Sequence, residues 1–476
     1  MRLHERLRQL RARSSRRGVA LIMVIGSLTI LAVMLSEFQD EMSVEFGSAL
    51  SDRDALRAEY AARSAINLSR LLIASEPTVS QAAGFLLAAL GQGKDKIQIP
   101  VWAFSGQILG AFNDAEGAAR FGSLGSFDLS QGSNLGLDGA GFEVKIVDED
   151  SKIGLNRAAR SIIGAQDVAR QLLGLMTGPQ YDPLFERRAE DGEYANRYDI
   201  CSAIIDWVDP DQDLENCEGT SNAAASPPED SFYSTLKNPY PRKNAPFDSL
   251  EELRMVRGVG DDFWSTFIEP NPDDPDQRPV TIWGSGKLNI NTVAAPTLLA
   301  YICAWAVPET PLCNDPTGEK QLNFITTLTI SKAMFAGIPL FRSPRQLSNA
   351  LQGKGQLAEM ALPLLGGEPI QLLSAKGFEE GLATRSQVFS IYADGYLKSG
   401  KRATHVRVTA VVDFRDAPTV QDLINQVTGQ TGQAQAGATT PGATPNESGD
   451  AVTNPNAIGG ALKPSTAGRI LYYRVN

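Results

Sequence analysis

The first part of the chain carries one long helical pattern of apolar residues. An uncharged stretch runs from Val19 to Leu35, and at 1.5 Å per residue it measures about 25 Å, the short end of a membrane span. Apolar residues then recur at steps of three or four, and the last two return to the same face: Leu35, Phe38, Met42, Phe46, Ala49, Leu56 and Tyr60. No proline occurs between Val19 and Glu76. The pattern predicts one unbroken helix from a membrane segment to about Ser75.

Strand patterns flank the middle of the chain. Residues 101–104 form a short apolar run, and residues 142–150 alternate between apolar and polar positions. Two further runs, 386–396 and 404–414, are separated by Ser399-Gly400-Lys401, which predicts a hairpin. A strong strand signal, Arg469–Val475, stands at the end of the chain. We expect this last strand to return to the edge of the sheet.

The part between these strands is predicted to be mainly helical. Helical patterns occupy residues 165–176, 200–208, 250–256 and 294–305. Two segments in this part resemble each other, residues 151–159 and 285–294, and each offers an asparagine (Asn156, Asn291) suited to capping the helix that follows. Residues 428–467 are rich in Gly, Ala, Thr, Pro, Gln and Asn and predict a disordered linker.

Charge is distributed unevenly along the chain. The first 18 residues hold seven arginines and one glutamate, a net charge of +6, so the rest of the chain carries −17 of the total of −11. A basic head before an apolar segment fits a cytoplasmic leader in front of an exported body. An acidic body argues against nucleic acid as a partner, because binding phosphate requires clustered Lys and Arg.

Four cysteines lie in two close pairs, Cys201 with Cys217 and Cys303 with Cys313. Neither pair has CxxC spacing, and His4 and His405 are too few and too remote to complete a zinc site. In an oxidising compartment each pair could form a local disulfide; otherwise the four are buried thiols.

The start of the chain resembles a known family. Arg16-Arg17-Gly18-Val19 before an apolar helix is similar to the leader of type IV pilins and type II secretion pseudopilins. The resemblance implies that a prepilin peptidase cuts after Gly18 and methylates Val19. Most members carry a glutamate five residues into the mature chain, where this chain has Met23. The protein K family of type II secretion lacks that glutamate, so the chain is identified as a member of it.

This resemblance implies an α+β, pilin-like fold, in which a long N-terminal helix packs on an antiparallel sheet interrupted by a large helical insertion. The expected divisions are a cleaved leader (1–18), a membrane helix and periplasmic stem (19–75), a sheet domain (76–155 and 380–476) and an inserted α-domain (156–379).

One acidic stretch offers site chemistry. Aspartates at 209, 211 and 213 have the alternate spacing with which a loop wraps a hard cation. The stretch is not an EF-hand, because Leu214 and Thr220 stand where glycine and glutamate are needed. A solvated acidic loop is the alternative reading. The family resemblance implies a structural calcium ion held by an Asp-Trp-x-Asp-x-Asp stretch and a later acidic pair before tyrosine, and spacing alone adds Asp213 and Glu218. The candidate residues are Asp206, Asp209, Asp211, Asp213, Glu218, Glu229 and Asp230, followed by Tyr233.

No nucleophile motif, P-loop or zinc-protease motif occurs, so we expect no enzymatic activity and no small-molecule substrate. The resemblance implies a structural subunit in the bacterial inner membrane, with most of the chain in the periplasm, that caps the pseudopilus and helps to start its assembly. Its partners would be prepilin peptidase, the other minor pseudopilins and the major pseudopilin. The alternative is a membrane-anchored DNA-binding protein of a competence system, because residues 247–260 and 285–294 resemble helix–hairpin–helix modules. Asp261 and Asp262 follow the hairpin directly and would repel phosphate.

Overall fold

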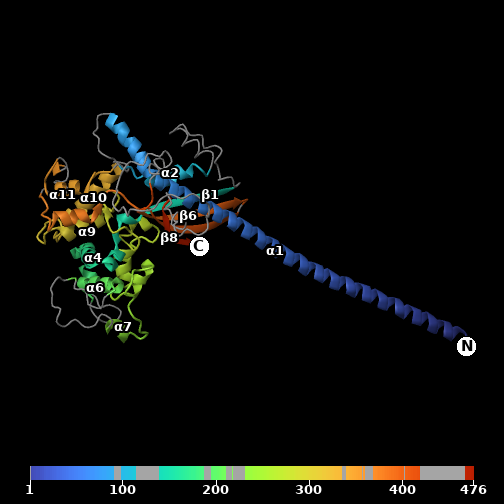
Figure 1. Cartoon of the computed structure of the whole chain (residues 1–476). Coiled ribbons are helices and arrows are strands. Elements are labelled where there is room, and N and C mark those ends of the chain that lie inside the picture. Colours follow the sequence, from blue (N-terminus) through green and yellow to red (C-terminus); the bar gives the residue numbers. More distant parts are fainter. Residues whose placement is uncertain are drawn as a thin grey trace, which may run out of the picture.

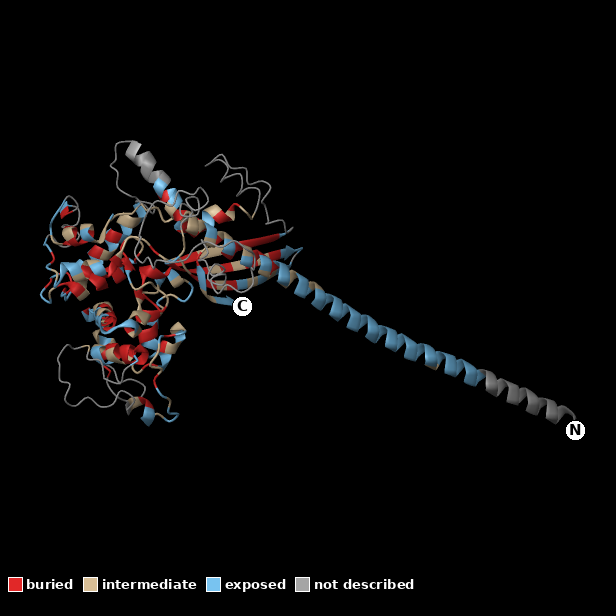
Figure 2. Ribbon diagram, in the orientation of Figure 1, coloured by how far each residue is buried: buried red, intermediate tan, exposed pale blue. Residues whose placement is uncertain are grey.

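A long helix, a four-stranded sheet and a helical insertion make up the protein (Figure 1). The computed structural model describes residues 2–89, 98–113, 139–186, 195–210, 217, 231–334, 339–355, 358–359, 368–400, 402–418 and 467–476. Helix α1 (Arg2–Ala89) is about 130 Å long, and its first half projects away from the rest of the molecule. Figure 2 shows that this projecting half is largely exposed from Gly18 onward, whereas buried residues gather in the sheet and in the insertion.

The sheet is antiparallel throughout, in the order β1-β6-β7-β8. Its strands are β1 (Ala140–Asp148), β6 (Val388–Ser399), β7 (Arg402–Asp413) and β8 (Arg469–Val475). Strands β6 and β7 form the predicted hairpin, with Gly400 in the left-handed region at φ +63°. The C-terminal strand pairs with β7 at the sheet edge, which confirms its predicted return. The predicted linker, 428–467, lies outside the described residues except for Ala467.

The second half of α1 packs on one face of this sheet through small side chains. Ala58, Ala61, Ala62 and Ala65 are fully buried there. The strand below also lacks a side chain at the closest point, because a Cβ on Gly395 would lie 2.0 Å from the carbonyl oxygen of Ala58. Small residues on both elements let the helix approach the sheet closely. Apolar residues of β1, β6 and β7 complete this core: Phe142, Ile146, Phe389, Ile391, Ala393, Val408, Ala410 and Val412.

Two predictions near the end of α1 were wrong. The helix continues through Pro77 to Ala89, because tertiary packing of Ile73, Glu76 and Ser80 holds it where the proline removes one backbone hydrogen bond. The expected strand at 101–104 is the 3₁₀ turn η1 (Val101–Phe104), which continues into α2 (Ser105–Gly110). A four-residue apolar run fits either structure, and here the Trp102 ring packs against Phe389 at 5.2 Å.

The insertion between β1 and β6 consists of two helical units with separate cores. The first helical unit, residues 153–283, is closed by the parallel pair β2 (Ile153–Gly154) and β3 (Val280–Thr281). Its helical segments are η4 (Leu155–Arg160), α4 (Ile162–Leu175), η5 (Pro179–Tyr181), α5 (Asp182–Phe185), α6 (Arg197–Val208), α7 (Ser231–Thr235), η6 (Leu250–Met255), α8 (Asp261–Phe263), η7 (Trp264–Ile268) and η8 (Pro275–Gln277).

The second helical unit, residues 288–383, is closed in the same way by the parallel pair β4 (Leu288–Asn289) and β5 (Leu382–Ala383). Its helices are α9 (Ala295–Trp305), α10 (Glu319–Met334), α11 (Pro344–Leu351) and α13 (Ala375–Glu380). The two units meet at α4 and α9, where a Cβ on Gly174 would lie 2.3 Å from the carbonyl oxygen of Ala300.

The two similar segments of the sequence do not cap helices. Ser161 caps α4, and α9 begins after Ala294 without a side-chain cap. Instead, Asn156 donates to the carbonyl oxygen of Phe247 and accepts from its N–H, and Asn291 makes the same two hydrogen bonds with Phe341. Each asparagine therefore fixes the chain just before a second, serine-capped helix of its own unit. The capping prediction was wrong because a local pattern does not reveal so distant a partner.

Three consecutive acidic residues, Asp148, Glu149 and Asp150, join the sheet to the insertion and are almost fully buried. Each carboxylate accepts hydrogen bonds from distant parts of the chain, with Asp150 accepting from the N–H groups of Ser285, Gln387 and Val388. Burial and the neighbouring carboxylate raise the pKa of Asp148, and burial raises that of Asp150. The sequence does not reveal this role, because three acids at a strand end are usually solvated.

Candidate assembly surface and acidic loop

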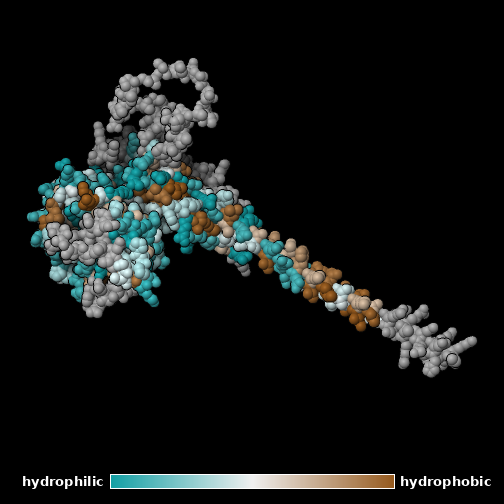
Figure 3. Space-filling model, turned by 60° about the horizontal axis from the view of Figure 1, so that its bottom comes forward, coloured by the Kyte–Doolittle hydropathy of each residue, from teal (hydrophilic) through white to brown (hydrophobic). Residues whose placement is uncertain are grey.

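Helix α1 carries an apolar stripe on the face opposite the sheet. The residues that predicted a continuous helix form this stripe, and its large members are between 49% and 65% exposed: Leu35, Phe38, Met42, Phe46, Leu56 and Tyr60. Figure 3 shows hydrophobic side chains recurring along the helix from its projecting end to the body of the protein. Leu56 and Tyr60 lie alongside the alanines that pack on the sheet. The helix therefore has a partner on one face and an exposed apolar stripe on the other.

The membrane segment lies at the start of this stripe. Residues 18–81 contain an apolar window of mean hydropathy 2.6 with no part buried in the protein, so the helix is long and apolar enough to cross a membrane. Gly18 and Val19 lie within α1 with open space around them, and Met23 is 69% exposed. A methyl thioether at this depth carries no charge, so a bilayer accepts it without the cost of a buried carboxylate.

The acidic loop begins at the C-terminal end of α6. Asp206 lies in the last turn of the helix and Asp209 directly follows it, and both are buried, with exposed fractions of 3% and 7%. The other five predicted ligands, Asp211, Asp213, Glu218, Glu229 and Asp230, lie outside the described residues. Among the described residues, no group of three or more potential metal-ligating side chains comes together.

The environment of the two described aspartates calls for positive charge. A helix C-terminus carries partial negative charge, which adds to that of the carboxylates. Arg242 supplies one cation: it is buried, and its guanidinium donates to the backbone carbonyl of Asp206 at 2.6 Å. An aromatic cluster of Trp207, Tyr233 and Tyr240 closes the other side. Burial raises the pKa of Tyr233 to about 12, so its hydroxyl stays neutral.

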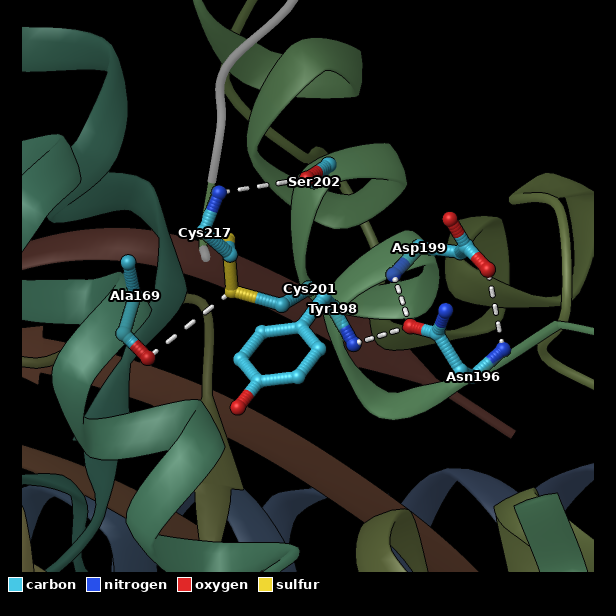
Figure 4. Close-up of a disulfide and its surroundings, with 7 residues drawn as sticks. All are labelled: Ala169, Asn196, Tyr198, Asp199, Cys201, Ser202 and Cys217. Carbon is cyan, nitrogen blue, oxygen red and sulfur yellow. Dashed lines mark hydrogen bonds between the residues drawn. A yellow bond between two sulfur atoms is a disulfide. The ribbon is translucent and has the colours of Figure 1, made fainter. Parts of the chain in front are cut away.

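A disulfide anchors this loop (Figure 4). Cys201, fully buried in α6, is bonded to Cys217 with an S–S distance of 2.11 Å. The bridge encloses residues 202–216, which include four of the candidate ligands. The N-terminus of α6 is fixed as well, because Asn196 and Asp199 form a reciprocal capping box. The second disulfide joins Cys303 and Cys313 in the second helical unit.

The hairpin that resembles a DNA-binding module packs against the rest of the first helical unit through Val256 and Val259. Gly258 has φ +81°, and a Cβ there would lie 2.6 Å from the side chain of Ile200. Arg254, a cation beside this hairpin, is paired with Asp261 at 2.7 Å and stacks on Trp264. Gly258 thus serves close packing, whereas Gly260 has open space around it, and the nearby arginine is paired within the protein.

Comparison with known proteins assigns this region to a family. Residues 180–267, which include the disulfide, the acidic loop and the hairpin, match the family model described as type II secretion system (T2SS), protein K. Over these residues the chain is similar to protein K of type II secretion, whose family consists of non-enzymatic pseudopilins.

Other comparisons add little to this assignment. A chain in the crystal structure of the GspK-GspI-GspJ complex from the enterotoxigenic Escherichia coli type 2 secretion system is similar at 16% identity, over 58% of this chain and 76% of that one, with a TM-score of 0.34. No curated protein matches the chain. The pilin-like architecture of this protein is evident from its own long helix on an antiparallel sheet.

Proposed function

We propose that this protein is a tip-capping minor pseudopilin that helps to start pseudopilus assembly for the export of folded proteins. Prepilin peptidase would cut after Gly18 and methylate Val19. The helix would hold the mature chain in the inner membrane, with the body in the periplasm. Its partners would be other minor pseudopilins and the major pseudopilin; the similar solved structure is, by its description, a complex with GspI and GspJ.

The exposed stripe on α1 is the observation that carries this proposal. Lipid can cover its first part, but Leu56 and Tyr60 lie where the helix already packs on the sheet. Large apolar side chains that recur along one helix face need a protein partner once they leave the bilayer. Another helix of the same kind, rising beside α1 from the membrane, would cover both parts of the stripe.

The position at the tip rests on Met23. In the family, the glutamate at this place is thought to attract the free amino terminus of a neighbouring subunit. A chain with an uncharged side chain there lacks this attraction between carboxylate and amino terminus. Nothing electrostatic would therefore favour the addition of a subunit above it. Replacing Met23→Glu should let the subunit enter positions below the tip, and quantitative mass spectrometry of sheared pseudopili should then find more of it per filament. An unchanged content would contradict the role given to Met23.

Cleavage tests the proposed function directly. Mass spectrometry of the protein extracted from membranes should show a chain that begins at a methylated Val19. A Gly18→Leu variant should retain its leader and fail to support secretion, whereas Gly47→Leu, a glycine with open space around it on the same helix, should be processed normally. An intact leader in cells with active prepilin peptidase would overturn the assignment.

We also propose that the acidic loop binds structural calcium. The supporting features are the buried Asp206 and Asp209 at a helix C-terminus and the density of carboxylates in the sequence. Calcium suits such an oxygen-rich loop better than magnesium, which demands stricter octahedral geometry. The protein should melt at a higher temperature in millimolar calcium than in chelator, and Asp209→Asn with Asp211→Asn should abolish the difference. The matched control is Asp261→Asn with Asp262→Asn. Equal melting of the unaltered protein in both buffers would leave a solvated loop.

A further inference from the structure

A cavity of about 460 Å³ lies where α1, the end of the sheet and the second helical unit meet. Its walls come from Glu76 of α1, from Gln98 and Trp102 of the following segment, and from Arg385 ahead of β6. The second helical unit contributes Lys332 of α10 and the turn that begins α9. The volume falls within the range of small-molecule sites, about 300–1,000 Å³.

Charged side chains of both signs line this cavity: Glu76 is buried, and Lys332 and Arg385 are partly exposed. Glu76 is 5% exposed and lies 3.8 Å from Arg385. Lys332 donates to the carbonyl oxygens of Ile290 and Val293, which leaves its ammonium group one further N–H. Burial raises the pKa of Glu76 to about 7 and lowers that of Lys332 to about 8, so both charges are poorly solvated.

Other polar groups of the cavity are already used by the fold. Both oxygens of Asp148 accept hydrogen bonds, from Asp150, Thr292 and Ser386. The side-chain amide of Asn291 already makes two hydrogen bonds with the backbone of Phe341. Glu76, Gln98, Lys332 and Arg385 are groups of the lining that retain capacity for a ligand.

Two buried atoms of this set lack a hydrogen-bond partner among the described residues, Gln98 Oε1 and Arg385 Nε. One is an acceptor and the other is a cationic donor. A buried polar group without a partner costs about 1–3 kcal/mol, and such groups in native structures call for an explanation. Water could satisfy them singly, but a cavity of this size would need on the order of ten molecules, each with several polar partners.

We propose that this cavity binds a small zwitterion of the amino-acid class. Its carboxylate would accept from Arg385 and Lys332, and its ammonium group would donate to Gln98 and Glu76. A simple anion would leave the acceptors unmatched, and a simple cation would meet two positive side chains. A molecule with both charges can pair with the donors and the acceptors at the same time. It would also link α1 to the second helical unit.

Isothermal titration calorimetry on the full-length protein in detergent, with each standard amino acid in turn, tests the proposal. At least one amino acid should bind. Its carboxyl amide and its N-acetyl derivative should each bind at least about tenfold more weakly, because each removes one charge. The Lys332→Met variant should show a similar loss, whereas Lys354→Met, at an exposed lysine of the same unit, should bind normally.

Each other result would overturn the proposal. If no standard amino acid binds and a crystal structure shows only water in the cavity, the polar groups serve hydration alone. If the masked derivatives bind as well as the parent, the ligand is not recognised as a zwitterion. If Lys332→Met binds normally, the site lies elsewhere. Should Lys332→Met fail to fold, Gln98→Met removes the acceptor from a half-buried position and should produce the same loss.

Discussion

The first and second helical units share the same arrangement at their two ends. Each begins with a two-residue strand, each ends with a parallel partner strand, and each holds the backbone of a phenylalanine with one asparagine. In both units that phenylalanine lies two residues before a serine whose helix follows. The frame of the two units is therefore common.

The difference lies in what the frame encloses. The asparagine and phenylalanine are 91 residues apart in the first unit and 50 in the second. The longer stretch holds α6, its disulfide, the acidic loop and most of the family-model match at 180–267. The added stretch of the first unit, and not the frame that both units share, therefore holds most of the residues that match the protein K family model.

The largest expected effect comes from removing the asparagine of either frame. Asn156→Ala leaves three backbone groups without their partner, two of Phe247 and one of Ile282, whereas Asn291→Ala leaves two, both of Phe341. Because these bonds are only partly buried, each unsatisfied group should cost near the lower end of about 1–3 kcal/mol, so we expect losses of about 3–4 and 2–3 kcal/mol. Hydrogen exchange of each unit measures them. Asn271→Ala, at an exposed turn, is the control. Negligible losses would show that the frames are not held by these bonds.

The disulfides should contribute nearly as much, and almost equally. They close loops between cysteines 16 and 10 residues apart, for which chain entropy gives about 3 kcal/mol and a few tenths less. Paired serine substitutions, Cys201→Ser with Cys217→Ser and Cys303→Ser with Cys313→Ser, followed by calorimetry, compare them. A much larger loss for the first pair would mean that the acidic loop depends on its bridge for more than loop closure.

Calcium should slow amide exchange in the first helical unit and leave exchange in the second unchanged. If the ion binds at the end of α6, amide exchange in α6 and in residues 231–240 should slow about tenfold in millimolar calcium, which corresponds to about 1.4 kcal/mol. Peptides of α9 and α10 provide the internal control and should exchange at the same rate in calcium and in chelator. Uniform slowing of both units would point to a general ionic effect rather than to a site.

The sequence predicted the elements that depend on local pattern. The 3.6-residue period predicted α1, and alternation with a glycine turn predicted the β6–β7 hairpin. It failed where distant contacts decide the structure. Proline normally ends a helix, but packing carries α1 through Pro77; Asn156 resembles a cap, but its partner lies 91 residues away. Of the acidic loop, the sequence supplied the candidate ligands, and the described residues place only Asp206 and Asp209.

The smallest expected effect concerns Lys332, a partly buried lysine of the second helical unit. Because burial lowers the pKa of Lys332 to about 8, the folded chain releases this proton before the unfolded chain, in which the lysine stays near 10.5. The cost of the buried charge is therefore fully present below pH 8, and the free energy of unfolding rises with pH between about 8 and 10.5. From pH 7.5 to 9 the gain is about 1 kcal/mol. Lys332→Met has no such proton, so its stability relative to the unaltered protein should fall by that amount over the same interval, as calorimetry at the two pH values would show. Lys354→Met, at an exposed position, should follow the unaltered protein. A constant difference between Lys332→Met and the unaltered protein would mean that water or a bound ion keeps the lysine charged in the folded chain.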